Sequence, residues 1–127
     1  MAINIVGTYV SKDEKHILNI TESVSSVGQF KGEFTAKDTP EGEVVYQIQN
    51  NGDASWAYTS DQAHAGIGFM VADKAEKTSD RQFVIFDSWA GSITSTNKLL
   101  MSGSRSYTKN NGEYSVFSFN NVEFIKQ

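Results

Sequence analysis

Apolar and polar residues alternate over short runs along the whole chain, which is the pattern of strands that bury one face. The runs are rich in Val, Ile, Phe, Tyr and Thr, and clusters of Gly, Asn, Asp and Ser separate them. No window of a dozen residues repeats its apolar positions at helical spacing. The pattern predicts strands at 4–11, 15–21, 28–36, 43–50, 64–74, 81–89, 93–103 and 112–126.

The predicted strands follow one another through short polar connections, and the Asn-Gly pair in "TKNNGE" is typical of a hairpin turn. This arrangement favours an all-β fold, an eight-stranded antiparallel up-and-down β-barrel, which removes exposed strand edges by closure. An open sandwich is the alternative. No linker or shift of composition divides the chain, so residues 1–127 are expected to form one domain.

The run "GIGFMVADK" at 66–74 has an apolar face that ends in a charged residue. Ile67, Phe69 and Val71 share one face by alternation, and the next residue on that face is Asp73. An inward apolar row that ends in a carboxylate indicates a polar group near the mouth of the barrel.

The last run, "YSVFSFNNVEFIK", is apolar on both faces. Phe117 and Phe119 lie on one face by alternation, and Val116 and Val122 lie on the other. A strand of this kind predicts that the outer wall is also covered, most simply by another subunit. We therefore expect a homo-oligomer, a dimer or a tetramer.

Composition narrows the possible partners. The net charge is −4 and the eleven Lys and Arg residues are scattered, which argues against nucleic acid as a partner. No apolar segment approaches the roughly 20 residues of a membrane helix, so no membrane span is expected. The chain has no Cys, which excludes disulfides, thiolate metal sites and thiol catalysis. The location is expected to be cytoplasmic if Met1 is native, and secreted if a signal peptide has been removed.

Candidate chemistry is sparse. His16 and His64 lie beside predicted strand starts and are interpreted as surface or rim residues, and no metal-binding or catalytic motif is present, so no cofactor is expected. Trp56 and Tyr58 fall in a predicted loop, and Trp89 closes a predicted strand. These three aromatic residues are candidates for ligand or partner contacts, with plugging of the barrel ends as the alternative.

Several blocks together resemble the avidin and streptavidin family along nearly the full chain. They are "GTYVSKDEKHILNI", "GQFKGEF", "GIGFMVADK", "NKLLMSGS" and "EYSVFSFNNVEFIK". The resemblance implies an eight-stranded barrel with a ligand pocket at one open end, usually in a tetramer, with biotin as the ligand and no catalysis.

Most ligand positions of that family are changed in this chain. The resemblance places them on Ser11, Lys15, Phe34, Ala36, Asp73, Lys98, Tyr114 and Val122, and Phe69, Val71 and Leu100 are added as pocket candidates. Asp73 and Lys98 stand where the family has tryptophans, and Phe34 lacks the hydroxyl of the family's tyrosine. Each buried hydrogen bond left unmade costs about 1–3 kcal/mol. A charge in the pocket must also be desolvated when an apolar ring enters. Tight biotin binding is therefore not expected.

Three classes of function follow from these observations. The first is a non-enzymatic avidin-like binding protein whose pocket is remade for another ligand or closed, with residual weak biotin binding as a variant. The second is a lectin-like or protein-interaction module that uses Trp56, Tyr58 and Trp89, as in a defence protein or toxin. The third is an enzyme, for which Asp73 with Lys98 is the only available pair. A structural salt bridge across the barrel mouth is the preferred interpretation of that pair.

Overall fold

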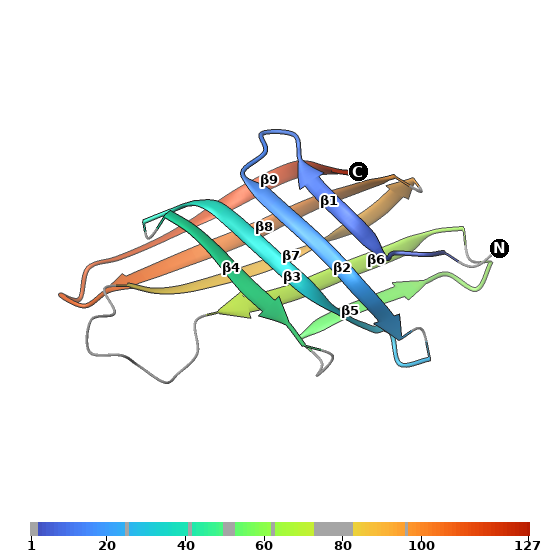
Figure 1. Cartoon of the computed structure of the whole chain (residues 1–127), viewed down its shortest axis with the longest axis horizontal. Coiled ribbons are helices and arrows are strands. Elements are labelled where there is room, and N and C mark those ends of the chain that lie inside the picture. The colour runs from blue at the N-terminus through green and yellow to red at the C-terminus, as the bar shows by residue number, and fades with distance from the viewer. Residues whose placement is uncertain are drawn as a thin grey trace.

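The computed structural model describes residues 3–24, 26–40, 42–49, 53–61, 63–72, 83–95 and 97–127 (Figure 1). Within these ranges every regular element is a strand. The strands are β1 (Gly7–Ser11), β2 (His16–Val24), β3 (Gln29–Thr39), β4 (Gly42–Ile48), β5 (Ala54–Tyr58), β6 (Ala65–Ala72), β7 (Phe83–Ser95), β8 (Lys98–Lys109) and β9 (Tyr114–Lys126).

The strands close into a barrel. Eight of them pair in the ring β1–β2–β3–β5–β6–β7–β8–β9, and β9 returns to β1. The remaining strand, β4, pairs with the second half of β3. Since β4 and β5 are both antiparallel to β3, they run in the same direction along one edge of it. The expected all-β, eight-stranded antiparallel barrel is confirmed, with one extra strand.

The prediction of a loop at Trp56 and Tyr58 is wrong. Residues Ala54–Tyr58 form β5, which pairs with β6, and the Trp56 amide donates to the Gly28 carbonyl at 2.9 Å. The alternation pattern of this five-residue strand is too short to recognise among its polar neighbours, because only two of its positions, Ala54 and Trp56, face the core.

The predicted turn at 90–92 is also wrong. β7 continues through this stretch to Ser95, and the chain reverses between Ser95 and Lys98. Gly91 lies inside the strand. A Cβ at Gly91 would overlap the carbonyl oxygen of Leu100, so the glycine permits close approach of β8.

The core fills the inside of the barrel, because alternate residues of each strand point inward. Large side chains from all sides meet there, including Leu18, Phe30, Phe34, Phe69, Trp89, Met101 and Phe124. Ile5, which precedes β1, is buried against the same cluster.

A β-bulge in β9 shifts the inward–outward alternation of the residues that follow it. Gly103 pairs with Phe119 and Met101 pairs with Val122, so β9 carries one extra residue in this interval, and Asn121 adopts a φ of 52° there. Val122 consequently packs against the core, on the same side as Phe119. The prediction that Val122 shares the outer face with Val116 is wrong, although Val116 itself is 71% exposed.

The two ends of the barrel differ. The end at which β1 turns into β2, β3 into β4 and β8 into β9 is called the Arg105 end below, and the opposite end is called the far end. The hairpin of β8 and β9 is long (Figure 1). β1 pairs only with Phe124–Lys126 of β9, so the first half of β9 extends beyond the part of the wall that β1 closes.

Candidate functional site

A buried ion pair lies inside the Arg105 end. Arg105 Nε donates to Asp87 Oδ1 and Nη2 donates to Oδ2, each at 2.7 Å, and both side chains are at most 1% exposed. The pairing of β7 with β8 sets Asp87 directly opposite Arg105 on the inner face. Arg105 Nη1 donates to the Asp38 carbonyl of β3 at 3.2 Å, which ties the pair across the barrel. The arrangement is neutral overall and leaves little of the guanidinium free for an anion.

The pair holds Arg105 in its charged form. Burial alone would lower the pKa of Arg105, but hydrogen bonding and charge attraction from Asp87, with a smaller contribution from Tyr107, raise that pKa above its usual value. A charge-assisted bidentate pair is the strong form of a guanidinium–carboxylate contact.

His16 lies next to this pair in an aromatic setting. Its ring is 1% exposed, and its centroid lies 5.0 Å from Trp89 and 4.9 Å from Phe119. Burial, together with the positive charge of Arg105, lowers the pKa of His16, so its imidazole is neutral at pH 7. Its Nδ1 is buried with no hydrogen-bond partner among the described residues. The expected surface or rim position for His16 is therefore wrong.

A row of aromatic rings runs from this buried region toward solvent. Trp89 stacks on Phe119 at 5.1 Å, Phe119 lies 5.3 Å from Phe117, and Phe117 lies 5.4 Å from Tyr107. The guanidinium carbon of Arg105 is 4.8 Å from the Phe119 ring centre, within the range of a cation–π contact. The row joins the packed core to the end of the barrel.

Three of these rings are only half-buried. Tyr107, Phe117 and Phe119, called the aromatic rim below, belong to the parts of β8 and β9 that extend past β1. They share the inner face with Arg105, because the pairs Tyr107–Ser115, Arg105–Phe117 and Gly103–Phe119 follow the alternation of the two strands. The rim therefore presents aromatic surface above a buried, neutralised charge pair.

Four of the pocket residues predicted from the family resemblance lie toward the same end. Ser11 and His16 meet where β1 turns into β2, and Ser11 Oγ donates to Asp13 Oδ1 at 2.6 Å. Lys15 is exposed and pairs with Asp38 at 3.2 Å. Phe34 and Ala36 are fully buried on β3, and Phe34 packs against Trp89 at 5.8 Å.

The row on β6 faces inward as the alternation predicts. Ile67, Phe69 and Val71 are each at most 5% exposed. Asp73, which follows them in the sequence, lies outside the described residues. The carboxylate found inside this end of the barrel is that of Asp87, on the neighbouring strand.

The other pocket candidates are spread over the surface or belong to the general core. Lys98 is half-exposed and its Nζ lies 3.2 Å from Glu123 Oε1. Leu100 is 40% exposed on the outer face, and Tyr114 is 80% exposed. Val122 packs on the core below the bulge.

Of the predicted Asp73–Lys98 pair, only Lys98 lies within the described residues. Ala72 ends β6 opposite Phe86, whereas Lys98 begins β8 opposite Ser95. Ser95 lies nine positions after Phe86 along β7, which is about 30 Å of extended chain. Lys98 thus lies at the far end of the barrel, where it forms an ion pair with Glu123.

The three candidate aromatic residues do not form one surface. Trp89 is 1% exposed in the core, and Trp56 is 5% exposed on β5. Tyr58 is 41% exposed near the far end and lies 5.4 Å from the Trp56 ring. Trp89 belongs to the site through its stacking on Phe119 and through its indole N–H, which points to Asp87 Oδ2 at 3.4 Å.

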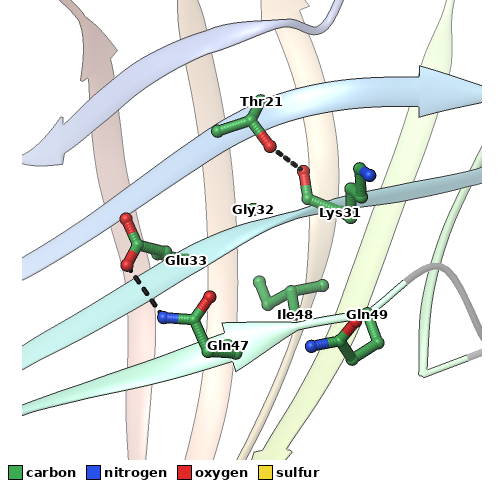
Figure 2. Close-up of a pocket in the computed structure, with 7 residues that line it drawn as sticks. All are labelled: Thr21, Lys31, Gly32, Glu33, Gln47, Ile48 and Gln49. Atoms are coloured by element: carbon green, nitrogen blue, oxygen red, sulfur yellow. Dashed lines mark hydrogen bonds between the residues drawn. The ribbon is translucent and has the colours of Figure 1, made fainter.

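A separate recess of about 320 Å³ lies on the wall formed by β2, β3 and β4 (Figure 2). Two hydrogen bonds join its lining residues: Thr21 Oγ1 donates to the Lys31 carbonyl at 3.2 Å, and Gln47 Nε2 donates to Glu33 Oε2 at 2.8 Å. The recess is shallow and has no buried unpaired group, so the Arg105 end remains the stronger candidate site.

A scan against models of protein families, a search of curated proteins and a search of solved structures each found no match. Within the described ranges, no group of three or more His, Cys, Asp or Glu side chains is arranged to hold a metal ion. The same ranges contain no helix long and apolar enough to cross a membrane.

Proposed function

We propose that this protein is a non-enzymatic binding protein with an avidin-like barrel, and that its ligand sits at the aromatic rim. The observation that carries the proposal is the partly buried aromatic face of Tyr107, Phe117 and Phe119 above the buried Asp87–Arg105 pair. Partly exposed rings on an inner face, held by strands on a rigid barrel, offer a preorganised surface for a ligand.

The electrostatics favour an uncharged ligand. Arg105 is neutralised by Asp87 and its Nη1 is engaged by Asp38, so a ligand anion would have to compete with these contacts. The ligand class is thus a neutral molecule with a flat apolar face that can stack on the rim.

Tight biotin binding is not part of the proposal. Trp89, His16, Phe34 and Phe119 pack against one another below the rim, where a deep ligand would need space. Phe34 offers no hydroxyl, and Lys98 and Tyr114 are directed elsewhere. An inherited barrel with a new surface site accounts for both the resemblance and these departures.

The test is a thermal-shift screen of a library of neutral metabolites, followed by calorimetric titration of the strongest hit. The variant Phe117→Ala removes a rim ring, and Phe86→Ala removes a 46% exposed ring on the outer face of β7. We expect the affinity to fall about tenfold or more in Phe117→Ala and to be unchanged in Phe86→Ala. Equal affinity for both variants, or a screen without a hit, would count against the site.

A lectin-like function remains the second candidate, because aromatic faces also stack on sugar rings. Of the three aromatic residues that the sequence suggested for sugar contacts, Trp56 and Trp89 are buried, which leaves Tyr58. The rim supplies rings of the required kind. A glycan array probed with the wild type and with Phe117→Ala distinguishes this candidate: a sugar signal lost in the variant supports it, and no sugar signal excludes it.

Catalysis is not proposed. The Asp87 carboxylate accepts from both Arg105 nitrogens and from Trp89, so its oxygens are engaged. Lys98 is paired with Glu123 on the outside of the barrel.

A further inference from the structure

The first half of β9 is a strand with one neighbour. Within the described ranges, Tyr114–Phe119 pair with β8, and β1 joins β9 only at Phe124–Lys126. A strand in this position presents a row of backbone N–H and C=O groups along its other edge. The barrel fold normally hides such an edge, so its presence here needs a physical explanation.

This edge lacks the features that usually protect it. From Tyr114 to Val122 the sequence YSVFSFNNV contains no charged residue and no Pro, and it is rich in residues that favour strands. On its outer face Tyr114 is 80% exposed and Val116 is 71% exposed. Natural proteins place Lys, Pro or a covering element on strands of this kind, because bare edges recruit other strands.

The outer surface beside this edge is also uncharged. The neighbouring outward positions of β8 are Ser104, Ser106 and Thr108. At the tip of the hairpin, Lys109 and Glu113 form an ion pair at 3.4 Å. Each chain carries a net charge of −4, yet two chains that meet along this strand bring no unpaired like charges together there.

We propose that the first half of β9 is an interface at which two copies of this chain pair edge to edge, antiparallel, about a two-fold axis. Antiparallel pairing of a strand with its own copy is the arrangement that two-fold symmetry produces. It would satisfy the open edge and continue β7, β8 and β9 of one copy into β9, β8 and β7 of the other. The inference does not depend on the proposed ligand.

Pairing would also cover apolar surface on both faces of the strand. Val116 and Tyr114 lose exposure on the outer face, and Phe117 gains the partner's β9 beside it on the inner face. The reason to propose a homo-oligomer thus differs from the one given by the sequence. The sequence suggested a last strand with two apolar faces, one of them including Val122, whereas the proposal rests on the open edge at residues 114–120.

The experiment is light scattering coupled to size exclusion, over a series of concentrations, on the wild type and three variants. Val116→Lys and Tyr114→Lys each place a charge on the open edge at an exposed position. Val45→Lys makes the same Val-to-Lys change at a 49% exposed position on β4. Circular dichroism and thermal unfolding confirm that each variant is folded.

The proposal predicts a wild-type dimer. Val116→Lys and Tyr114→Lys should each weaken it about tenfold or more, because a charged side chain on a strand edge opposes pairing with another strand, and Val45→Lys should leave it intact. Three results would overturn the proposal. They are a wild type that stays monomeric at the highest concentration, a dimer that withstands both edge variants, and a dimer lost equally in Val45→Lys.

Discussion

Arg105 and Asp87 face each other across β7 and β8 inside the barrel, joined by two hydrogen bonds of 2.7 Å and shielded from solvent. Their position matters because the resemblance to the avidin family leads to the expectation of a ligand pocket at one end of the barrel. The ion pair, Trp89 and His16 fill the interior at this end, which is why the proposed ligand site lies above them, at the partly buried aromatic rim.

Breaking the buried pair should be costly. We expect Asp87→Ala to lower the free energy of unfolding by about 3–5 kcal/mol, because it leaves the Arg105 charge buried without a partner. The matched control is Glu123→Gln, which removes the exposed ion pairs with Lys98 and Lys12 and should leave the stability nearly unchanged. Urea unfolding measures both, and an equal loss in the two variants would contradict the structural role of the pair.

The double variant Asp87→Leu with Arg105→Met separates the loss of a charge partner from the loss of packing. Because it removes both charges and keeps apolar volume, we expect it to recover much of the stability lost in Asp87→Ala. If the double variant is as unstable as Asp87→Ala, the ion pair contributes through its geometry and not through charge balance alone.

His16 should make stability fall as the pH falls. Its pKa in the folded protein is lowered from 6.5 by burial and by Arg105, so the unfolded chain binds a proton at a pH where the folded protein does not. This contribution is present in full above about pH 6.5 and is lost as the pH drops toward the lower pKa of the folded state. His16→Phe should flatten the stability profile between pH 7.5 and pH 5.5, roughly the range over which an ordinary histidine titrates. An NMR titration of the His16 ring that gives an ordinary or raised pKa would contradict this prediction.

Gly103 should be intolerant of even a small side chain. A Cβ at Gly103 would lie 2.5 Å from Cδ2 of Trp89, whose indole covers the glycine. We expect Gly103→Ala to destabilise the protein by about 1–3 kcal/mol and to change the fluorescence of Trp89. Gly66→Ala is the control, because the nearest atom to its Cβ would be at an ordinary 3.6 Å. Unchanged stability in Gly103→Ala would mean that Trp89 does not rest on this position.

Biotin should not bind tightly. The positions that would have to receive it hold packed aromatic rings or face outward, as Lys98 and Leu100 do. Calorimetric titration is expected to give no measurable binding at micromolar biotin. A dissociation constant in the nanomolar range or below would show that the core rearranges to admit the ligand.

The fold class could be predicted from the sequence, because the alternation of apolar and polar residues is a local property of each strand. It placed Ile67, Phe69 and Val71 on the inner face, where the structure has them. It failed at two places. The predicted strands stop at Trp89 and resume at Ile93, although Gly91 lies inside β7 and lets β8 approach closely, and the bulge at Asn121 reversed the face assigned to Val122.

The site could not be assembled from the sequence, because it depends on the register of β7 and β8. With a turn at 90–92, Asp87 would oppose Ser95, whereas the observed turn sets it opposite Arg105. The one available signal was the inward alternation of Ile85, Asp87 and Trp89, which placed an acidic residue in an apolar row. It could not identify the partner, which lies 18 residues further along the chain.

The central claim, ligand binding at the aromatic rim, is tested most directly by an NMR shift map of the ¹⁵N-labelled protein with the strongest neutral hit. The predicted result is that the largest amide shifts gather at Tyr107, Phe117 and Phe119, while the amides of Trp56 and Tyr58 at the far end stay in place. Shifts gathered at Trp56 and Tyr58, or spread evenly over the barrel, would contradict the claim.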